Sequence, residues 1–509
     1  MNSKQAITDA SDAGVVLAAR AKEAGMVYVP EQPIVFELAL ENLTPTEMDL
    51  VPLNGGNGPR LRVIDALGVY VVHGADMKAD LRAFGPRVLE SPVAREVRKS
   101  RLSPHARNKM DVNVAEYGPP LHRGKHLFDA VHFIDKGVAV RSNRVEFEVV
   151  GAKVLTAAVG LGRCSEMLWL AQPEIPGAKA RLLGRRSALT GHHVMGTGAY
   201  LGETVPTARL ALSRFAPGGD WGQQWFAVAS GRTVEVIAHN STKPEWRSGP
   251  IDLPFEAAVP VARFPGRDEY AIVLISGVAA GKPVLGGVKV TVEAGEGTIG
   301  QPWTIRLSTA PKHIVCAFEP KGPIAVLWVS DDGAFSRVHR LDVDEAGVAV
   351  YPEHIIRVTP NRILAVTADM PSDGPQSFLL LESDRARAGR VGILKIPVAS
   401  TGPFQVALAP VSGWPELDVQ AVVLETDTAG TPKIGLVDAQ GRLFGGDLGG
   451  ILQLTGPDDP PVVLPHIIAF EDHGLKTCTI SAFDDHGYLL HRPMPEAGVP
   501  GAPIYEEGR

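Results

Sequence analysis

The chain has 509 residues, a length that predicts about three domains. Hydrophobic residues make up 45% and charged residues 21%, which is typical of a globular protein with a sizeable core. The net charge is only −7, whereas a dedicated nucleic-acid-binding protein is usually strongly basic, so the composition disfavours that class.

The first 25 residues predict a short helical extension and no export signal, because Asp9 and Asp12 interrupt any apolar stretch. The segment 11–24 is rich in alanine and can be capped by Ser11 or Asp12. It is followed by Gly25, a residue that commonly ends a helix. We therefore expect a short N-terminal helix over residues 11–24.

Three cysteines, Cys164, Cys316 and Cys478, lie far apart in apolar, strand-like runs. Such spacing predicts no disulfide framework, and each is interpreted as a small buried hydrophobe. No apolar run approaches the length of a membrane span. We expect a cytoplasmic protein that does not bind membranes.

Glycine and tryptophan separate two regions near residue 150. Glycine occupies about 7% of residues 1–150 and about 12% of residues 151–509, and all seven tryptophans lie in the second region. Dense glycine between short apolar runs predicts many strands joined by tight turns. The sequence therefore predicts an all-β chain with a boundary near residue 150.

Seven similar units follow residue 151, and each opens with an alternating apolar run that ends in a turn rich in Gly, Pro or Asp. The units begin at Leu155, Leu210, Val259, Ile314, Ile363, Phe404 and Ile467. Their average spacing suits one four-stranded blade and a loop, since a blade needs about 40–50 residues. Such units bury their faces only by stacking, and a ring removes most exposed edges. The last unit is expected over Val462 to about Pro493, with a strand near residue 151 as a candidate to complete it.

The second halves of two units also match: DDGAFSRVHR (Asp331 to Arg340) and DDHGYLLHR (Asp484 to Arg492) share an acidic turn and a His-Arg ending. Together the units resemble the blades of β-propeller proteins, and the resemblance implies a seven-bladed β-propeller over residues 151–509. It is a resemblance of architecture, because the Trp-Asp signature of WD repeats is missing and the paired glycines of kelch repeats are sporadic.

Residues 26–150 also predict strands, in segments such as IVFELALENL and NRVEFEVVG. The end of this region resembles an immunoglobulin-like or fibronectin-like module, whose last strand follows a Ser-Asn turn, here Ser142–Asn143. The resemblance implies an immunoglobulin-like β-sandwich. No Gly/Ser-rich or Pro-rich linker separates it from the first blade, so a fixed orientation of the two domains is expected.

A basic segment at about 82–109 interrupts this sandwich. It holds eight Lys or Arg against two Glu, with three prolines, which predicts an inserted loop. These charges must face solvent or an acidic surface. The candidate residues for partner binding or protease cleavage are Arg95, Arg98, Lys99, Arg101 and Arg107. The alternative interpretation is a solvated loop without a partner.

Two motifs fail the tests of their chemistry. Gly295, Gly297 and Gly300 form GxGxxG, but a strand follows where a dinucleotide site needs a helix. Residues 342–353 nearly fit a calcium loop, but Ala346 occupies a ligand position and the flanks read as strands, so a hairpin turn is favoured. We expect no cofactor and no metal.

The histidines are interpreted as structural or surface residues. His192 and His193 are adjacent on an extended chain and point to opposite sides, which suits chelation poorly. His122, His126 and His132 lie in strand and turn sequence, where their spacing does not gather ligands.

The search for hydrolytic chemistry finds no GxSxG motif and no catalytic set. The acid pairs Asp331–Asp332 and Asp484–Asp485 each precede a hairpin glycine and are expected to cap their turns. Residues 330–333 only partly resemble the Asp-box of sialidases, because the spacing is one residue short.

We therefore expect a non-enzymatic protein–protein interaction platform, an adaptor or scaffold, with an acidic protein surface or a protease of a signalling or defence complex as its partner. The alternative is a propeller-type hydrolase or carbohydrate-binding protein with its site at the central channel. That alternative requires carboxylates or arginines from several blades to converge there.

Overall fold

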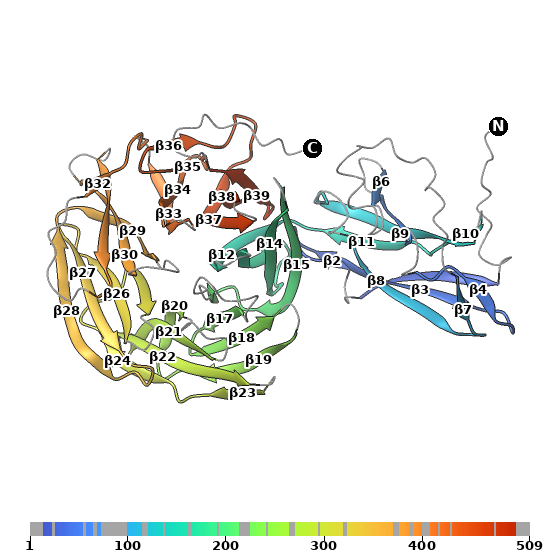
Figure 1. The fold of residues 1–509 in the computed structure, drawn as a ribbon, viewed down its shortest axis with the longest axis horizontal. Coiled ribbons are helices and arrows are strands. Elements are labelled where there is room, and N and C mark those ends of the chain that lie inside the picture. The colour runs from blue at the N-terminus through green and yellow to red at the C-terminus, as the bar shows by residue number, and fades with distance from the viewer. Residues whose placement is uncertain are drawn as a thin grey trace.

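The computed structural model describes residues 14–22, 26–53, 58–64, 69–72, 99–114, 121–135, 138–160, 165–190, 193–212, 224–240, 243–263, 270–293, 296–318, 323–369, 376–385, 390–399, 408–415, 418–427, 430–472 and 475–494. Within these ranges the chain forms β-strands and no α-helix, which confirms the prediction of an all-β protein. Figure 1 shows a propeller-like ring of sheets with a smaller β unit at its side.

The smaller unit, formed by the N-terminal part of the chain, has two main sheets around one hydrophobic core. In β3 (Val35–Asn42) every second residue is buried, and Phe36 of this strand stacks on Phe128 of the other sheet with ring centroids 4.0 Å apart. One sheet has the order β1 (Val15–Ala21), β3 (Val35–Asn42), β8 (Arg107–Asn113). The other has the order β2 (Val27–Tyr28), β11 (Val145–Val149), β9 (Gly124–Asp135), β5 (Arg60–Ile64), β6 (Val69–Val72), with β10 (Val138–Arg141) also on β9. A two-stranded sheet joins β4 (Met48–Leu50) to β7 (Ser100–Leu102).

The prediction of a helix over residues 11–24 is wrong. Residues 15–21 form β1, which pairs antiparallel with β3, and the residues around it at 11–13 and 23–25 lie outside the described ranges. Val15, Leu17 and Ala19 are buried, a period of two that places one face of β1 on the core. Tertiary pairing outweighs the helix propensity of alanine here.

Part of the predicted basic insertion at 82–109 is paired strand. Residues 100–102 form β7 and residues 107–109 begin β8, which pairs along the length of β3. The charged side chains of β8 stand on the outer face while Val112 enters the core, so the basic pattern concealed a strand. Residues 73–98 lie outside the described ranges.

Seven sheets follow in the described residues from Ala152 onward. Their strands lie side by side in chain order, except that the fifth strand of the third sheet pairs with the third strand. The first sheet contains β12 (Ala152–Gly160), β13 (Ser165–Pro173), β14 (Ala180–Thr190) and β15 (His193–Thr204). The second contains β16 (Arg209–Leu212), β17 (Gln224–Ser230), β18 (Thr233–Asn240) and β19 (Lys243–Asp252). The third contains β20 (Glu256–Arg263), β21 (Tyr270–Ala279), β22 (Lys282–Glu293), β23 (Glu296–Ile299) and β24 (Trp303–Arg306). The next two contain β25 (His313–Phe318), β26 (Ile324–Asp331), β27 (Ser336–Val343), β28 (Ala349–Thr359); and β29 (Arg362–Asp369), β30 (Ser377–Ser383), β31 (Val391–Pro397), β32 (Ala409–Pro410). The last two contain β33 (Val419–Thr426), β34 (Pro432–Asp438), β35 (Leu443–Asp447), β36 (Gly450–Gln453); and β37 (Val462–Asp472), β38 (Leu475–Asp484), β39 (Leu489–Pro493).

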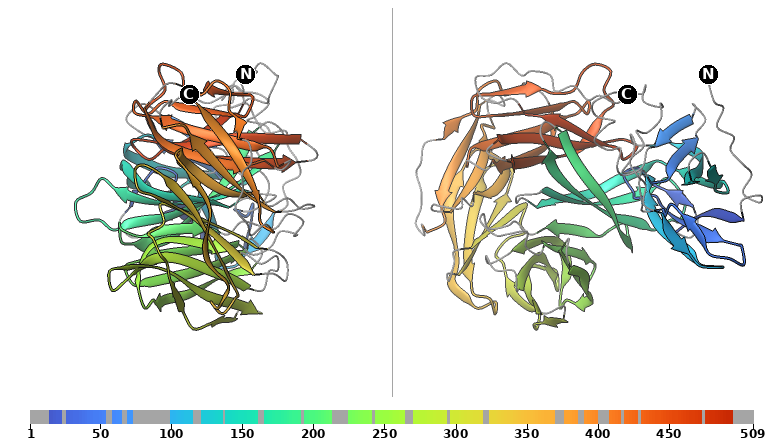
Figure 2. Two further views of the ribbon diagram at one scale, coloured as in Figure 1. Left: turned by 90° about the vertical axis from the view of Figure 1, so that its left-hand side faces the viewer. Right: turned by 45° about the vertical axis from the view of Figure 1, so that its right-hand side comes forward.

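The first strands of these sheets form the inner wall of the ring. β12, β16, β20, β25, β29, β33 and β37 each contact the first strand of the next sheet, and β37 contacts β12, which closes the ring. Figure 2 shows the same arrangement from two further directions. Because each sheet is flanked by two others, its apolar strands are covered on both faces, as in the fully buried run from Ala271 to Gly277 in β21.

Two details of the repeat differ from expectation. The sequence predicts that the apolar run beginning at Phe404 opens the sixth unit. Its described part instead contributes β32, the last strand of the fifth sheet, and the sixth sheet opens at β33. Both runs are short and apolar, so their pattern does not distinguish a last strand from a first one. The strand near residue 151, β12, pairs with β13 of its own sheet and does not complete the sheet of β37 to β39.

A recurring hydrogen bond joins neighbouring sheets. The turn between the second and third strands of a sheet offers a backbone carbonyl to the start of the next sheet's first strand: Ala257 N–H donates to Gly231 O (2.7 Å), Val462 N–H to Gly441 O (2.9 Å) and Ala152 N–H to His486 O (2.9 Å). The last of these bonds closes the ring between the seventh sheet and the first.

Glycine is required in two of these turns. Gly487 has φ +90° and Gly441 has φ +75°, in the region that L side chains rarely adopt. A Cβ atom at Gly487 would lie 2.7 Å from the backbone oxygen of Ala152, and one at Gly441 would lie 2.6 Å from Cβ of Pro461. The glycines therefore allow both the turn and the close approach of the next sheet.

We predict that Gly487→Ala destabilises the protein more than Gly333→Ala. Gly333 has φ +89°, but nothing lies within 4 Å of the position that a Cβ atom would take, so its substitution costs only the backbone strain of about 1 kcal/mol. Gly487→Ala adds a collision with the backbone at the ring closure. Urea unfolding measures both, and equal losses of unfolding free energy would contradict the closure role of Gly487.

The N-terminal unit is fastened to the first and seventh sheets. Arg181 Nη1 donates to Val27 O (2.7 Å), and Arg185 pairs with Glu31 at 2.8 Å. The Tyr488 hydroxyl donates to Leu121 O at 2.9 Å. A hydrophobic cluster includes Val29 of the N-terminal unit together with Trp169 of the first sheet and Phe483 of the seventh.

Candidate interaction surface

The fourth sheet ends in an apolar, exposed rim on β28, which lies at the outer side of the ring in Figure 1. Residues 349–352 are all exposed, and because successive side chains of a strand point to opposite faces, both faces of the strand are open there. Exposed fractions range from 47% to 61% for the large apolar side chains that define this β28 rim, Val348, Val350, Tyr351, Ile355 and Val358. Clustered exposed apolar side chains mark protein contact sites more often than scattered ones do.

The backbone of the rim is a poor template for another strand. Within the described chain β28 pairs only with β27, and that ladder is interrupted by three register shifts. Pro352 in the middle of β28 has no N–H group to offer. Bulges and proline are devices that protect sheet edges from pairing. The rim therefore suits contact through side chains and not through strand addition.

A chain of polar side chains holds β28 against the rest of its sheet. Ser330 Oγ of β26 lies 2.8 Å from Nε2 of His339 in β27, and Nδ1 of His339 lies 3.2 Å from Oε1 of Glu353 in β28. Glu353 also accepts a hydrogen bond from the backbone N–H of Ser308 at 2.9 Å. Farther along, Arg357 of β28 forms a two-pronged ion pair with the buried Glu382 of the fifth sheet at 2.7 and 3.0 Å.

Ser330, His339 and Glu353 follow one another along hydrogen bonds as the serine, histidine and acid of a hydrolase triad do. No sequence motif reveals this series, because the three residues come from three strands. The geometry fits a structural role better. The His339 side chain is only 2% exposed and stacks on Trp328 with centroids 5.1 Å apart. The seventh sheet repeats the pair, with Ser481 Oγ 2.6 Å from Nδ1 of His491. A pair that recurs at matching strands belongs to the repeat, and the shared His-Arg endings were its signal in the sequence.

Burial lowers the pKa of several histidines. It brings the pKa of His466 to about 4 and that of His491 to about 3, and it lowers the pKa of His339 and His132. For His313 burial, aided by the charges of Lys312 and Arg362, brings the pKa to about 4. These imidazoles are neutral in the folded protein at neutral pH.

We predict that the unfolding free energy falls as the pH is lowered from about 6.5 to about 4. The folded-state pKa values lie below those of an unfolded chain, so the unfolded state takes up protons in this window and the folded state does not. Urea unfolding at a series of pH values measures the slope. The variant His466→Leu removes one such group and should give a shallower slope, and an unchanged slope would contradict the assignment.

The structure describes only three of the five residues of the predicted basic site. Arg95 and Arg98 lie outside the described residues. Lys99 pairs with Asp135 at 2.6 Å, Arg101 with Asp49 at 3.8 Å, and Arg107 with Glu41 at 2.9 Å. The three side chains are 41%, 78% and 58% exposed, so all three face solvent, each beside a carboxylate on the same unit.

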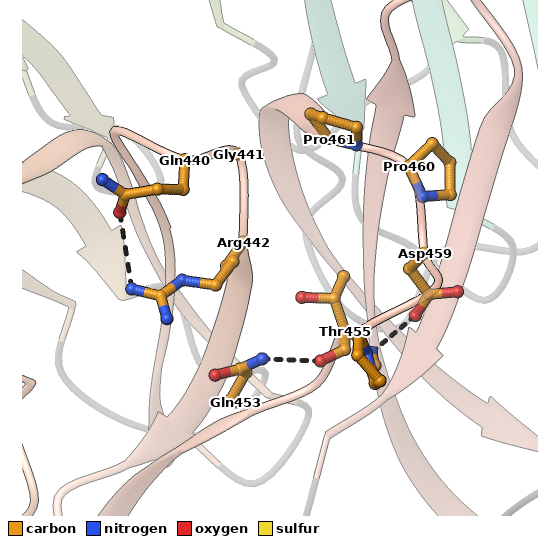
Figure 3. Close-up of a pocket in the computed structure, with 10 residues that line it drawn as sticks. Gln440, Gly441, Arg442, Gln453, Thr455, Asp459, Pro460 and Pro461 are labelled. Atoms are coloured by element: carbon orange, nitrogen blue, oxygen red, sulfur yellow. Dashed lines mark hydrogen bonds between the residues drawn. The ribbon is translucent and has the colours of Figure 1, made fainter.

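A polar hollow of about 370 Å³ lies between the turn 440–442 of the sixth sheet and the segment 455–461 that leads into β37 (Figure 3). Its polar groups already bond one another or their neighbours. Arg442 pairs with the buried Asp438 at 2.6 Å, and Gln453 donates to Thr455 O at 2.8 Å. Asp459 accepts from the backbone of Gly456 and pairs with Arg492 at 3.0 Å. The hollow therefore presents little unsatisfied polarity to a ligand.

The acid pairs cap turns, as predicted. Asp332 Oδ1 accepts from the backbone N–H of Ala334 (3.0 Å) and Phe335 (2.7 Å), and Asp484 Oδ1 accepts from His486 (2.9 Å) and Tyr488 (2.8 Å). The hydrogen bonds that Asp332 accepts from Phe335, Arg337 and Ala334 lower its pKa to about 2.

The calcium-like segment 342–353 is a hairpin, which confirms that interpretation. Asp342 pairs with the buried Arg340, and Asp344 caps the turn by accepting from Ala346 and Val348. Glu353 bonds to His339 elsewhere in the sheet. The described part of the chain contains no group of three or more His, Cys, Asp or Glu side chains placed to hold a metal ion.

The remaining motifs fall on packed or undescribed positions. In the GxGxxG motif, Gly295 lies outside the described residues and Gly297 is in β23, where a Cβ atom would lie 1.9 Å from the Trp246 ring. This glycine therefore permits packing between two outer strands. His193 is in β15, and its neighbour His192 lies outside the described ranges.

The other histidines and cysteines that the sequence singled out are mostly buried. His126 Nδ1 lies 2.9 Å from Gly124 O, and His132 Nε2 lies 2.8 Å from Val51 O. Cys316 is buried, and burial raises the pKa of the Cys478 thiol to about 12. Cys164 lies outside the described residues.

No protein-family model matches the chain. No curated protein matches it either. Among solved structures, AofleA from Arthrobotrys oligospora is similar at 12% identity and a TM-score of 0.36, over 69% of this chain and 92% of that one. BBS1N in complex with ARL6DN is similar at 11% identity and a TM-score of 0.33, over 63% of this chain and 89% of that one. Sqt1 from Chaetomium thermophilum is similar at 12% identity and a TM-score of 0.34, over 67% of this chain and 84% of that one.

None of the described segments forms a helix with the length and hydrophobicity that crossing a membrane requires.

Proposed function

We propose that this protein is a non-enzymatic protein–protein interaction platform, built from a seven-bladed β-propeller and an immunoglobulin-like sandwich. The observation that carries the proposal is the β28 rim, where exposed valine, isoleucine and tyrosine side chains gather on one rigid strand. Tyrosine and aliphatic side chains on a fixed surface supply contact area at a small cost in conformational entropy.

The rigidity of the rim supports this function. Glu353 ties β28 to His339 and Ser308, and Arg357 ties it to Glu382 of the next sheet. A partner that docks on the rim therefore need not order the strand first, which preserves more of the binding free energy.

The basic segment supports an acidic partner surface or a protease as the partner. Lys99, Arg101 and Arg107 are exposed, and their ion pairs with carboxylates of the same unit are of the kind that contribute about 0–1 kcal/mol. Such pairs are weak enough to be exchanged for those of a partner. Arg95 and Arg98 precede them in the sequence, and the positive charge of the segment would steer an acidic partner toward it.

A photo-crosslinking amino acid at position 351 tests the rim. We expect Tyr351→p-benzoylphenylalanine to give a discrete adduct with one partner protein in extracts of the source organism. The adduct should be lost in a background of Val350→Ser and Val358→Ser. Surface substitutions of this kind change stability by only about 0.5 kcal/mol, so the variant should remain folded.

Leu452 provides the matched control, because it is 56% exposed on β36, the outermost strand of the sixth sheet. The same probe at position 452 should not capture that partner. No adduct at position 351, or equal capture at positions 351 and 452, would refute the rim as a specific docking surface.

The basic segment has its own test. Changing Arg95, Arg98, Lys99 and Arg101 together to Ala should leave the melting temperature nearly unchanged, because the described pairs are solvent-exposed. It should abolish capture of the acidic partner or cleavage in a cell extract. If the quadruple variant unfolds, the segment is structural; if capture and cleavage persist, the segment is not the contact.

A further inference from the structure

Three arginines converge on one buried carboxylate on the outer face of the N-terminal unit. Asp129 of β9 is only 1% exposed, and it accepts hydrogen bonds from Nε (2.6 Å) and Nη2 of Arg62 on β5. Arg141 Nε lies 3.9 Å and Arg144 Nε 3.8 Å from Asp129 Oδ2. We call Arg62, Arg141 and Arg144 the arginine cluster.

The cluster carries more positive charge than its carboxylate can neutralise. Three guanidinium groups against one carboxylate leave a net charge of +2. Arg62 already uses both oxygens of Asp129, and the other two arginines stand at ion-pair range but beyond hydrogen-bonding distance. In the described part of the chain, Nε of Arg141 is buried and has no hydrogen-bond partner. A buried N–H donor without an acceptor is costly, so the site has an unmet demand for an oxygen ligand.

The fold presents these arginines rigidly. β11 pairs with the first half of β9 and β10 with its second half, so the connection 141–144 crosses beside Asp129. Ala130 N–H donates to Ser142 Oγ at 2.9 Å. Asn143 bonds to both the N–H and the carbonyl of Ala19 in the opposite sheet, at 2.9 and 3.0 Å. The Ser-Asn turn thereby fixes the arginine on each side of it.

The site is open to a ligand. The Arg141 and Arg144 side chains are 38% and 60% exposed, whereas the carboxylate beneath them is covered. Arg60 lies on the same strand as Arg62, with its guanidinium 4.9 Å from the centroid of the Phe133 ring, and adds further positive charge to this face.

We propose that the arginine cluster binds a phosphate monoester group carried by a partner protein, an inference that rests on the proposed function and names the chemistry of one contact. A phosphate monoester has a charge of about −1.5 to −2 at pH 7, which matches the net +2 of the cluster, and three acceptor oxygens for guanidinium N–H groups of Arg141 and Arg144. A single carboxylate would leave half of this charge unbalanced.

Calorimetric titration of the full chain with O-phosphoserine, inorganic phosphate and glutamate, at constant ionic strength, tests the proposal. We expect O-phosphoserine and phosphate to bind and glutamate to bind at least about tenfold more weakly. Arg144→Gln and, separately, Arg141→Gln should each weaken phosphoserine binding about tenfold or more, the loss expected for a hydrogen bond to a charged group.

Arg20→Gln is the matched control, because Arg20 is exposed on the same unit and also pairs with a carboxylate, that of Glu37, at 2.8 Å. It should leave the affinity for phosphoserine nearly unchanged. The proposal is overturned if phosphoserine does not bind, if glutamate binds equally well, or if Arg20→Gln weakens binding as much as Arg144→Gln does.

Two separate arginine variants are used so that a variant that does not fold cannot decide the test. The proposal is also overturned if no folded variant of the two loses affinity for phosphoserine. Its failure also leaves the platform proposal standing, since crosslinking at the β28 rim is a separate measurement on a different sheet.

Discussion

The hydrogen bond from Ala152 N–H to His486 O is the contact on which the ring depends. It joins residues 334 positions apart, and the first and seventh sheets acquire their second neighbour only when it forms. The entropy of closing so long a segment grows only with the logarithm of its length, so closure is far cheaper than the number of residues suggests. What it does require is a correct turn at residues 484–487. The Asp484 carboxylate caps that turn, and Gly487 leaves room for the backbone of Ala152.

The N-terminal unit strengthens the same junction. Glu31 pairs with Arg185 of the first sheet and accepts from the backbone N–H of Leu489 in the seventh at 3.4 Å. Arg123 pairs with Glu174 of the first sheet at 3.0 Å and lies 3.0 Å from Nδ1 of His486. The unit therefore spans the two sheets that closure brings together. Opening the ring would break these contacts as well, so the stability of the ring and the attachment of the unit are physically coupled.

Composition and repeat pattern were sufficient to predict an all-β chain and the turns capped by aspartate, because glycine density and Asp-Gly turns are local properties. The N-terminal helix was predicted wrongly because alanine in Val15–Ala21 is compatible with either structure, and only pairing with β3 decides between them. The start of the sixth unit was predicted one strand too early, because a short apolar run can be the last strand of one sheet or the first strand of the next.

The candidate surfaces were harder to predict than the fold. The β28 rim is invisible in the sequence, since its valines and isoleucine look like those of any buried strand. The same holds for the arginine cluster. Arg62 and Arg144 are 82 positions apart, and only the register of β5 and β9, with the β10–β11 connection, brings them to Asp129. Basic sequence drew attention to residues 82–109 because charge was concentrated there. Charged residues that are far apart in the sequence and meet only in the folded chain give no such local concentration of charge.

The position of the rim in the ring constrains how a platform of this kind can work. In a closed ring of seven sheets the fourth lies farthest from the junction of the seventh and first, where the N-terminal unit is attached (Figure 1). The β28 rim and the arginine cluster are thus on opposite sides of the structure. A small partner could occupy only one of them, and two such partners would bind independently because neither site needs to rearrange for the other. Cooperation between the sites would require a single long partner that follows the ring from one to the other, since a tether raises the effective concentration only when it can span both.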